Sequence, residues 1–171
     1  MSETLLNSFA NTPLGKMLII ASEKGLSFLE FNGPNRADYL NRRLKRYFYP
    51  FRVVPGRNKH SDLACRWLEH YFTHRRDPYI RIHLDVRGTD FELRVWHEMQ
   101  RIPFGKTTGY GEIAANIEMP KGSRAVGGAC GRNPVSIIIP CHRVIGGNGT
   151  LTGYGGGLAK KSFLLGHEAV S

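Results

Sequence analysis

The hydrophobic pattern of residues 1 to about 85 changes between a period typical of strands and a period typical of helices. Leu14–Ala21 and Leu26–Phe31 are two apolar runs separated by a turn-forming Ser-Glu-Lys-Gly sequence, which predicts a β-hairpin. Asn35–Phe48 has apolar residues at helical spacing, and a second amphipathic helix is expected to begin near Ser61. Arg81–Val86 alternates apolar and polar positions and predicts a strand. The pattern therefore indicates a small mixed α/β unit.

From about residue 88 onward the pattern is helical and interrupted by glycine-rich loops. Thr89 and Glu92 have the spacing of a capping box, which predicts the start of a helix. Two short helices are expected over Tyr110–Ile117 and Ser123–Gly131, joined by a turn that contains glycine. This arrangement is typical of a helix-turn-helix, but other small helical cores share it. Val135–Ile139 is an apolar run that predicts a buried strand.

The second of these short helices is unusually rich in glycine and alanine. Glycine costs about 1 kcal/mol relative to alanine inside a helix, so its presence in Ser123–Gly131 calls for a reason. One explanation is close packing between helices. The other is close approach to a ligand surface, because a slim helix can enter a groove that excludes a bulky one. The sequence leaves both open.

Composition and length restrict the class of protein. The chain has 171 residues, of which 41% are hydrophobic, and this argues against wholesale disorder. No run approaches the ~18 apolar residues that cross a bilayer, and the first residues lack the pattern of a secretory signal. Three cysteines cannot all pair with one another, which favours a reducing compartment. We therefore expect a cytoplasmic protein without a membrane partner.

The charge balance points to an acidic partner. The chain has 24 lysines and arginines against 14 acidic residues, a formal net charge of +10. Between Met119 and His167 there are six basic residues and no acid, and Glu168 is the only carboxylate side chain among the last 53 residues. Such a stretch favours binding to a polyanion, although basic surfaces also serve solubility alone.

The chemistry of the chain is concentrated at Cys141. It follows an apolar segment and precedes His142 and Arg143, a setting that favours the reactive thiolate. Glu168 is a candidate to orient the imidazole of His142; alternatively, it stabilises the C-terminal helix or pairs with Lys161 or Arg143. The alternative is an inert buried cysteine. No zinc-ligand spacing and no phosphate-binding glycine loop occurs, so neither a metal nor a cofactor is expected.

The segment around this cysteine resembles a known active-site signature. Pro140-Cys141-His142-Arg143-Val144-Ile145-Gly146, preceded by Gly131-Arg132-Asn133-Pro134-Val135, is similar to the signature of the O6-alkylguanine-DNA alkyltransferases, the methylated-DNA–protein-cysteine methyltransferases. The similarity extends from about Thr89 to Glu168, and the N-terminal half matches more weakly. It implies an α+β protein with an N-terminal α/β domain of ribonuclease-H-like fold over residues 1–86. A helical helix-turn-helix domain that carries the cysteine would follow over residues 87–171.

The resemblance also implies an unusual reaction and its partner. Family members bind double-stranded DNA through the minor groove and flip an alkylated guanine into a pocket. The O6-alkyl group moves to the cysteine, and the protein is inactivated after one turnover. O4-alkylthymine is a further candidate substrate. The implied state in solution is a monomer, with cooperative assembly on DNA left open.

The family's functional positions match particular residues of this chain. Cys141 matches the alkyl acceptor, His142 the base that takes its proton, and Glu168 the carboxylate that orients the imidazole. Tyr110 matches the donor to guanine N3, and Arg124 the finger that fills the gap left by the flipped base. Further matches in the DNA-binding helix are Ala125, Gly127, Gly128 and Arg132. Matches at the hinge and the pocket are Asn133, Val144, Tyr154 and Gly155.

Some features depart from the family pattern or leave other functions open. Some relatives carry a structural zinc in the N-terminal domain, but no cysteine precedes Cys65 here and none is expected. Cys130 is a second thiol on the predicted DNA-binding helix. Two other classes of protein compete with a suicidal alkyltransferase: a non-catalytic helix-turn-helix protein, and a cysteine hydrolase or acyltransferase. An intact cysteine and histidine argue against the first, and the lack of a recognisable oxyanion hole argues against the second.

Overall fold

The computed structural model describes residues 1–169 of the chain. It divides into two compact units, with the boundary between Arg87 and Gly88. Each unit has its own core and is described by itself.

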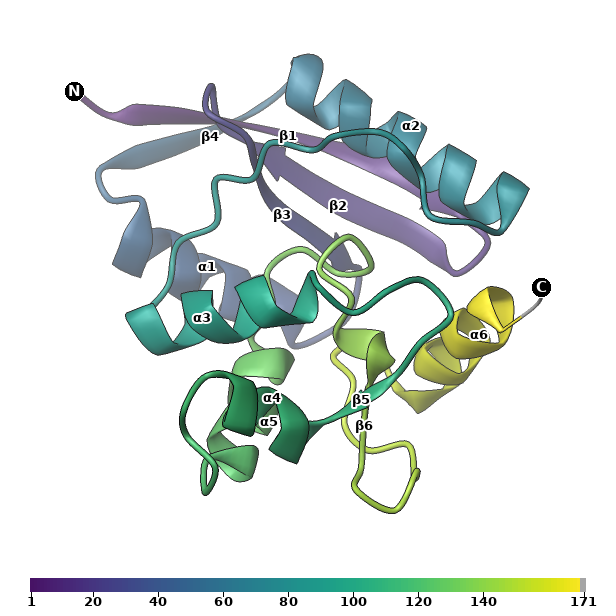
Figure 1. Ribbon diagram of the computed structural model, residues 1–171. Helices are drawn as coiled ribbons and strands as arrows, with labels where there is room; N and C mark the ends of the chain where they lie inside the picture. The colour runs from purple at the N-terminus through teal and green to yellow at the C-terminus, as the bar shows by residue number, and fades with distance from the viewer. Residues whose placement is uncertain (170–171) are drawn as a thin grey trace. The chain divides into compact units, whose positions relative to one another are not determined.

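The first unit is built on a four-stranded sheet (Figure 1). Its strands are β1 (Glu3–Thr12), β2 (Gly15–Ala21), β3 (Leu26–Phe31) and β4 (Phe51–Pro55), in the spatial order β3-β2-β1-β4. β2 pairs antiparallel with both β1 and β3, whereas β4 runs parallel to β1. The predicted hairpin is confirmed as the β2–β3 pair.

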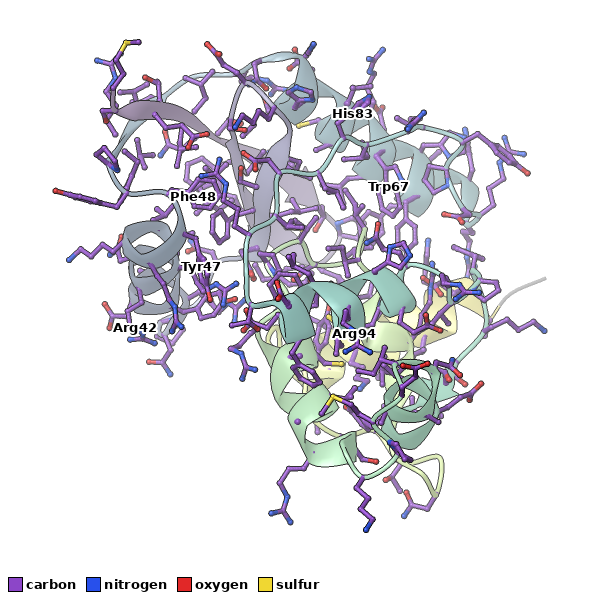
Figure 2. All side chains as sticks on the ribbon, turned by 60° about the vertical axis from the view of Figure 1, so that its left-hand side comes forward. Arg42, Tyr47, Phe48, Trp67, His83 and Arg94 are labelled. Carbon is purple, nitrogen blue, oxygen red and sulfur yellow. The ribbon has the colours of Figure 1, made fainter. Side chains whose placement is uncertain are left out.

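Two helices complete this unit, α1 (Arg36–Tyr47) and α2 (Lys59–His74). Leu44 and Phe48 at the end of α1 join a core cluster with residues of the first three strands. Figure 2 shows Phe48 turned toward the strands and Arg42 on the outer side of α1. α2 begins two residues before Ser61, because Asn58 caps the helix and Ser61 completes the capping box.

The predicted strand over Arg81–Val86 is wrong. Only Leu84 forms a bridge, parallel to Leu26, and the amide of Asp85 donates to the carbonyl of Leu26 at 2.9 Å. The carboxylate of Asp85 accepts from the hydroxyl of Ser22 at 2.6 Å and from the guanidinium of Arg87. The segment therefore pairs with β3 through one bridge only, and the side chain of Asp85 bonds to Ser22 and Arg87. The alternating pattern of Arg81–Val86 does not form a strand.

The second unit contains four α-helices, one 3-10 helix and a short pair of strands among its described residues. The elements are α3 (Asp90–Met99), β5 (Thr108–Gly109), α4 (Tyr110–Asn116), α5 (Ser123–Gly131), η1 (Cys141–Arg143), β6 (Val144–Ile145) and α6 (Leu158–Glu168). The capping box of Thr89 and Glu92 is confirmed, as are the two short helices. α3, α4 and α5 pack together, and the indole nitrogen of Trp96 donates to the carbonyl of Ala129 at 2.9 Å.

The predicted strand over Val135–Ile139 is also wrong. The segment is a buried loop in which Ile137 takes a positive φ of 71° and the amide of Ile139 donates to the carbonyl of Val135 at 3.0 Å. The side chain of Asn133 holds this loop by accepting from the amide of Val135 and donating to the carbonyl of Ile139. The side-chain amide of Asn133 therefore makes hydrogen bonds with this backbone that a partner strand would make in a sheet.

No helix in the described part of the chain is both long and apolar enough to cross a membrane.

Candidate active site

The thiol of Cys141 lies at the start of η1 and is almost completely buried. The residue is 7% exposed, and its sulfur is not in a disulfide. The side-chain nitrogen of Asn133 donates to Sγ at 3.1 Å and to the carbonyl of Ile139 at 2.8 Å. A hydrogen bond to the charged form of a group favours that form, so Asn133 favours a thiolate on Cys141. The resemblance had implied only a hinge at Asn133, so this contact with the sulfur is an additional role.

A carboxylate and two basic side chains form a buried network beside the cysteine. Oε1 of Glu168 lies 2.7 Å from Nε2 of His142, and both side chains are essentially inaccessible. Arg143 donates to both carboxylate oxygens of Glu168, at 2.8 and 3.0 Å. α6 and η1, which carry these residues, contact each other (Figure 1). The structure therefore joins His142 and Glu168 as the sequence led us to expect.

The protonation of this network follows from its burial and its partners. Burial lowers the pKa of the His142 imidazole below its usual range, and this outweighs the opposing effect of Glu168. Burial alone would raise the pKa of Glu168, but the hydrogen bonds from His142 and Arg143 outweigh it and lower the pKa to about 2. At neutral pH the carboxylate is therefore charged and the imidazole neutral.

The tautomer of the imidazole follows from the same geometry. Because Glu168 is ionised, Nε2 of His142 donates its hydrogen to that carboxylate. Nδ1 then has a free lone pair, and no hydrogen-bond partner for it lies within the described residues. This nitrogen can accept a proton from the neighbouring thiol.

Cys141 opens onto a cavity of about 280 Å³. Tyr110 reaches this cavity because β5 and β6 pair in parallel, with Thr108 opposite Val144 directly after the 3-10 helix. The hydroxyl of Tyr110 donates to the carbonyl of Thr152 at 3.0 Å, and burial raises the pKa of this tyrosine. The residues that line the cavity are Tyr110, Gly127, Cys130, Gly131, Cys141, Gly153, Tyr154 and Gly155.

The expected pocket residues do not all lie in this cavity. Tyr154 and Gly155 line it, as the resemblance implies. Val144 is fully buried and is not among the lining residues; its backbone pairs with Thr108 and its carbonyl accepts a hydrogen bond. Cys130 lies in the cavity wall with its thiol 3.5 Å from the sulfur of Met99. Burial raises the pKa of Cys130 to about 12, so this second thiol stays protonated.

Other residues of α5 line an open groove of about 870 Å³. Arg124 and Ala125 are exposed there, next to Lys121 before the helix. Arg132 also lines the groove, and its Nε donates to the buried carboxylate of Glu92 at 2.6 Å. α5 thus separates the inner cavity that holds the thiol from an outer groove bordered by lysine and arginine.

Contacts within the protein do not account for the glycines of α5. A Cβ added at Gly127 would meet only the ring of Tyr110 at 3.8 Å, which is an ordinary contact, and one added at Gly131 would meet nothing within 4 Å. At Gly128 the nearest atom is a guanidinium nitrogen of Arg132 at 3.1 Å, at the end of a long side chain. Of the two explanations for this slim helix, the geometry favours close approach to a ligand.

Two basic residues have roles in the site that differ from those expected from the sequence. Arg143 was considered as a partner of Glu168 only as an alternative to His142, whereas in the structure both side chains bond to that carboxylate. Lys161 was considered as a partner of Glu168, but its ammonium instead donates to three backbone carbonyls. Because long basic residues are mostly exposed, their sequence positions give little signal of burial.

Comparison with known proteins identifies the family. Residues 90–170 match the model described as "6-O-methylguanine DNA methyltransferase, DNA binding domain", and residues 5–86 match "6-O-methylguanine DNA methyltransferase, ribonuclease-like domain". The chain belongs to the 6-O-methylguanine DNA methyltransferase family. Its mixed α+β fold agrees with the one that the resemblance implied.

Members of this family resemble the chain over most of its length. A protein of Methanosarcina acetivorans named methylated-DNA–protein-cysteine methyltransferase is 42% identical over 154 residues, which cover 90% of this chain and 92% of that protein. One of the same name from Haemophilus influenzae is 35% identical over 171 residues, covering 97% and 87%. The crystal structure of Mycobacterium tuberculosis OGT in complex with DNA matches with a TM-score of 0.77 and 37% identity, over 97% of this chain and 92% of that one. These similarities support DNA as the partner of this family member.

Residues 1–169 contain no group of three or more histidine, cysteine, aspartate or glutamate side chains that could hold a metal ion.

Proposed function

We propose that this protein repairs DNA by transferring the O6-alkyl group of an alkylated guanine to Cys141, once and irreversibly. The observation that carries the proposal is the cavity of about 280 Å³ that the thiol of Cys141 lines, together with the following residue, His142, whose Nε2 is bonded to Glu168. Such a cavity lies just below the usual range for drug-sized ligands and suits a single heterocyclic base. Membership of the 6-O-methylguanine DNA methyltransferase family identifies this base as an O6-alkylated guanine.

The proposed reaction begins with transfer of the thiol proton to His142, through water as in the family. The thiolate then attacks the alkyl carbon, an S–C bond forms, and the C–O6 bond breaks with its electron pair going to the guanine. Glu168 stabilises the imidazolium, and Asn133 favours the thiolate before attack. Tyr110, whose hydroxyl lies at the cavity, donates to guanine N3 as negative charge grows on the leaving base. The product is a thioether, so the protein does not turn over.

The outer groove along α5 is the proposed surface for duplex DNA. The exposed face of α5 would enter the minor groove, with Ala125 and Gly128 allowing close approach and Arg132 contacting the backbone. Gly127 lines the inner cavity and would allow close approach of the flipped base there. The alkylated base would be flipped past α5 into the inner cavity. The three cysteines are free, which fits a reducing compartment such as the cytoplasm, and a monomer suffices for the reaction because one unit holds the whole site.

Mass spectrometry tests the proposed function directly. After incubation with duplex DNA that contains O6-methylguanine, the intact protein should gain one methyl group, and peptide analysis should find it on Cys141. Repeated turnover without protein modification would identify a hydrolase or acyltransferase instead. Binding to the lesion without modification would identify a protein that only recognises damage.

Arg124→Ala should impair repair of duplex DNA much more than transfer from free O6-benzylguanine. Arg124 is exposed on α5 and is the proposed finger that keeps the flipped base out of the stack. Flipping a base out of the duplex costs a few kcal/mol. Loss of the Arg124 side chain should therefore slow duplex repair on the order of 10- to 100-fold. Single-turnover rates on both substrates check this. Equal losses on the two would assign Arg124 to the pocket or the fold.

DNA binding should depend steeply on salt. If about four to six phosphates are neutralised, log K should fall with log salt at a slope of roughly −4 to −5. Replacing Lys121 and Arg124 by glutamine should reduce the magnitude of the slope by about two, because each lost phosphate contact removes roughly 0.9.

A matched control for the salt experiment lies in the first unit. Residues 1–87 hold 15 of the 24 lysines and arginines and 8 of the 14 acidic residues, so their net charge is +7 against +3 for residues 88–171. Replacing the exposed Arg42 and Lys45 of α1 by glutamine removes the same charge from this more basic unit. The slope should stay near that of the parent protein. A larger change from this pair than from the α5 pair would contradict the proposed DNA surface.

A further inference from the structure

Lys161 is a buried lysine without a counter-ion. It lies in α6 with an exposure of 0%, among the largest fully buried side chains of the chain. Its ammonium donates to the carbonyls of Val144 at 2.6 Å, Thr152 at 2.9 Å and Gly153 at 3.3 Å. Among the described residues no carboxylate lies within ion-pair distance of it. Burying an ammonium is costly even with its hydrogen bonds made, so this arrangement calls for a function.

The three carbonyls belong to two separate parts of the site. Val144 directly follows the 3-10 helix that begins with Cys141. Thr152 and Gly153 directly precede Tyr154 and Gly155, which line the cavity. One ammonium therefore ties the loop that forms one wall of the cavity to the segment that carries the thiol.

The aromatic wall of the cavity is coupled to the same point. The hydroxyl of Tyr110 donates to the carbonyl of Thr152, which also accepts from Lys161. The ammonium lies 6.0 Å from the centre of the Tyr110 ring, at the outer limit of a cation–π contact. Movement of the lysine would disturb Tyr110 and the loop together.

We infer that Lys161 is a positioning residue for alkyl transfer, which closes the loop 146–157 against the cysteine segment and places an unbalanced positive charge near the sulfur. The inference rests on the proposed function, because it assigns a role within that reaction. A preformed cavity removes the cost of ordering the loop when the base enters. A fixed positive charge also lowers the free energy of the thiolate relative to the thiol.

The other groups that face Cys141 leave this charge uncompensated. From η1 and α6, Glu168 is paired with Arg143, and the neutral His142 adds no charge. From α4 and α5, Tyr110 and Cys130 remain protonated below pH 9, because burial raises the pKa of each. Burial lowers the pKa of Lys161, whereas a negative charge on Cys141 raises it. Because such coupling is reciprocal, the charged ammonium of Lys161 also favours the thiolate of Cys141.

Two substitutions and a neighbouring control test the inference on the whole protein. Lys161→Met keeps the length of the side chain without charge or hydrogen bonds, and Lys161→Gln keeps hydrogen-bond donors without charge. Lys160→Met is the control, since it removes the same charge one residue away on a side chain that is only half-buried. Single-turnover transfer from free O6-benzylguanine and from O6-methylguanine duplex is measured between pH 6 and 9, with melting temperature on the same samples.

We expect both Lys161 variants to lose on the order of 10- to 100-fold in rate at pH 7 and the Lys160 variant to lose little. The pH at which the rate is half-maximal should rise in both Lys161 variants. The loss should be larger with the free base, which has no DNA contacts outside the cavity to help order the loop.

Two results would overturn the inference. One is a Lys161→Met protein with the rate and pH profile of the Lys160 control. The other is a rate that falls only in proportion to the folded fraction with an unchanged pH profile, in either Lys161 variant. Failure of the parent protein to accept any alkyl group would instead refute the proposed function itself.

Discussion

Cys141→Ala is expected to abolish alkyl transfer while leaving DNA affinity within about twofold of the parent protein. The transferred group has no other acceptor at the cavity, because burial raises the pKa of Cys130 to about 12 and keeps that thiol protonated. A protonated thiol is a weak nucleophile. DNA affinity should persist because the proposed DNA surface is the outer groove, and Cys141 does not line that groove. Labelled O6-methylguanine duplex and a binding assay on the same preparation measure the two effects.

The fold should tolerate this substitution. Cys141 is buried, but Asn133, which donates to its sulfur, also donates to the carbonyl of Ile139 and so keeps a partner. Cys130→Ala and Cys65→Ala are the matched controls, and each should transfer at close to the parent rate. Residual transfer by Cys141→Ala that disappears in a double variant with either control would identify another cysteine as the acceptor.

Local signals in the sequence predicted the helices of the fold well. The capping box at Thr89 and Glu92 involves side chains within three residues of the backbone that they cap. The turn before Ser123 is equally local, because the amide of Gly122 donates to the carbonyl of Met119. β4 was not anticipated, because it pairs with β1 over nearly fifty positions, as between Glu3 and Phe51. β1 was missed although it also pairs with the neighbouring β2. Val135–Ile139 was mistaken for a strand because burial makes a loop as apolar as a strand.

The sequence predicted the residues of the site that belong to the cysteine motif or stand out by their charge. Cys141 and His142 are adjacent in sequence, and Glu168 stood out as a lone acid in a basic region. The remaining contacts depend on the tertiary fold. Tyr110 meets the cavity only through the pairing of β5 with β6, and the burial of Lys161 depends on three carbonyls that any residue type could supply. Every residue has a backbone carbonyl, so the sequence does not show which carbonyls accept from a buried lysine. Only the three-dimensional structure shows this role.

Glu168→Gln is expected to slow single-turnover transfer on the order of 10²- to 10⁴-fold at neutral pH, the range typical of a positioned acid–base group. Since the pKa of Glu168 is about 2, the parent carboxylate is fully charged throughout an assay between pH 6 and 9. It supports the imidazolium of His142 and fixes the tautomer whose Nδ1 accepts the proton. A neutral amide keeps the size of the side chain but stabilises the imidazolium far less. Raising the pH toward 9 should partly rescue the variant, because solvent hydroxide then generates the thiolate, and the parent rate should change less over the same range.

Loss of stability must be separated from loss of chemistry in this variant, because Glu168 also pairs with Arg143. Removing one partner of a buried pair leaves an uncompensated charge, so Glu168→Gln should also lower the melting temperature. Arg143→Lys is the matched control: it breaks the two-bonded contact to Glu168 and destabilises the protein but leaves the Glu168–His142 bond in place. If Glu168 acts on the chemistry, the rate per folded molecule should fall far more in Glu168→Gln than in Arg143→Lys, and only the first should recover at high pH. Equal rates per folded molecule in the two variants, with no recovery at high pH, would mean that Glu168 serves only to hold α6 against η1.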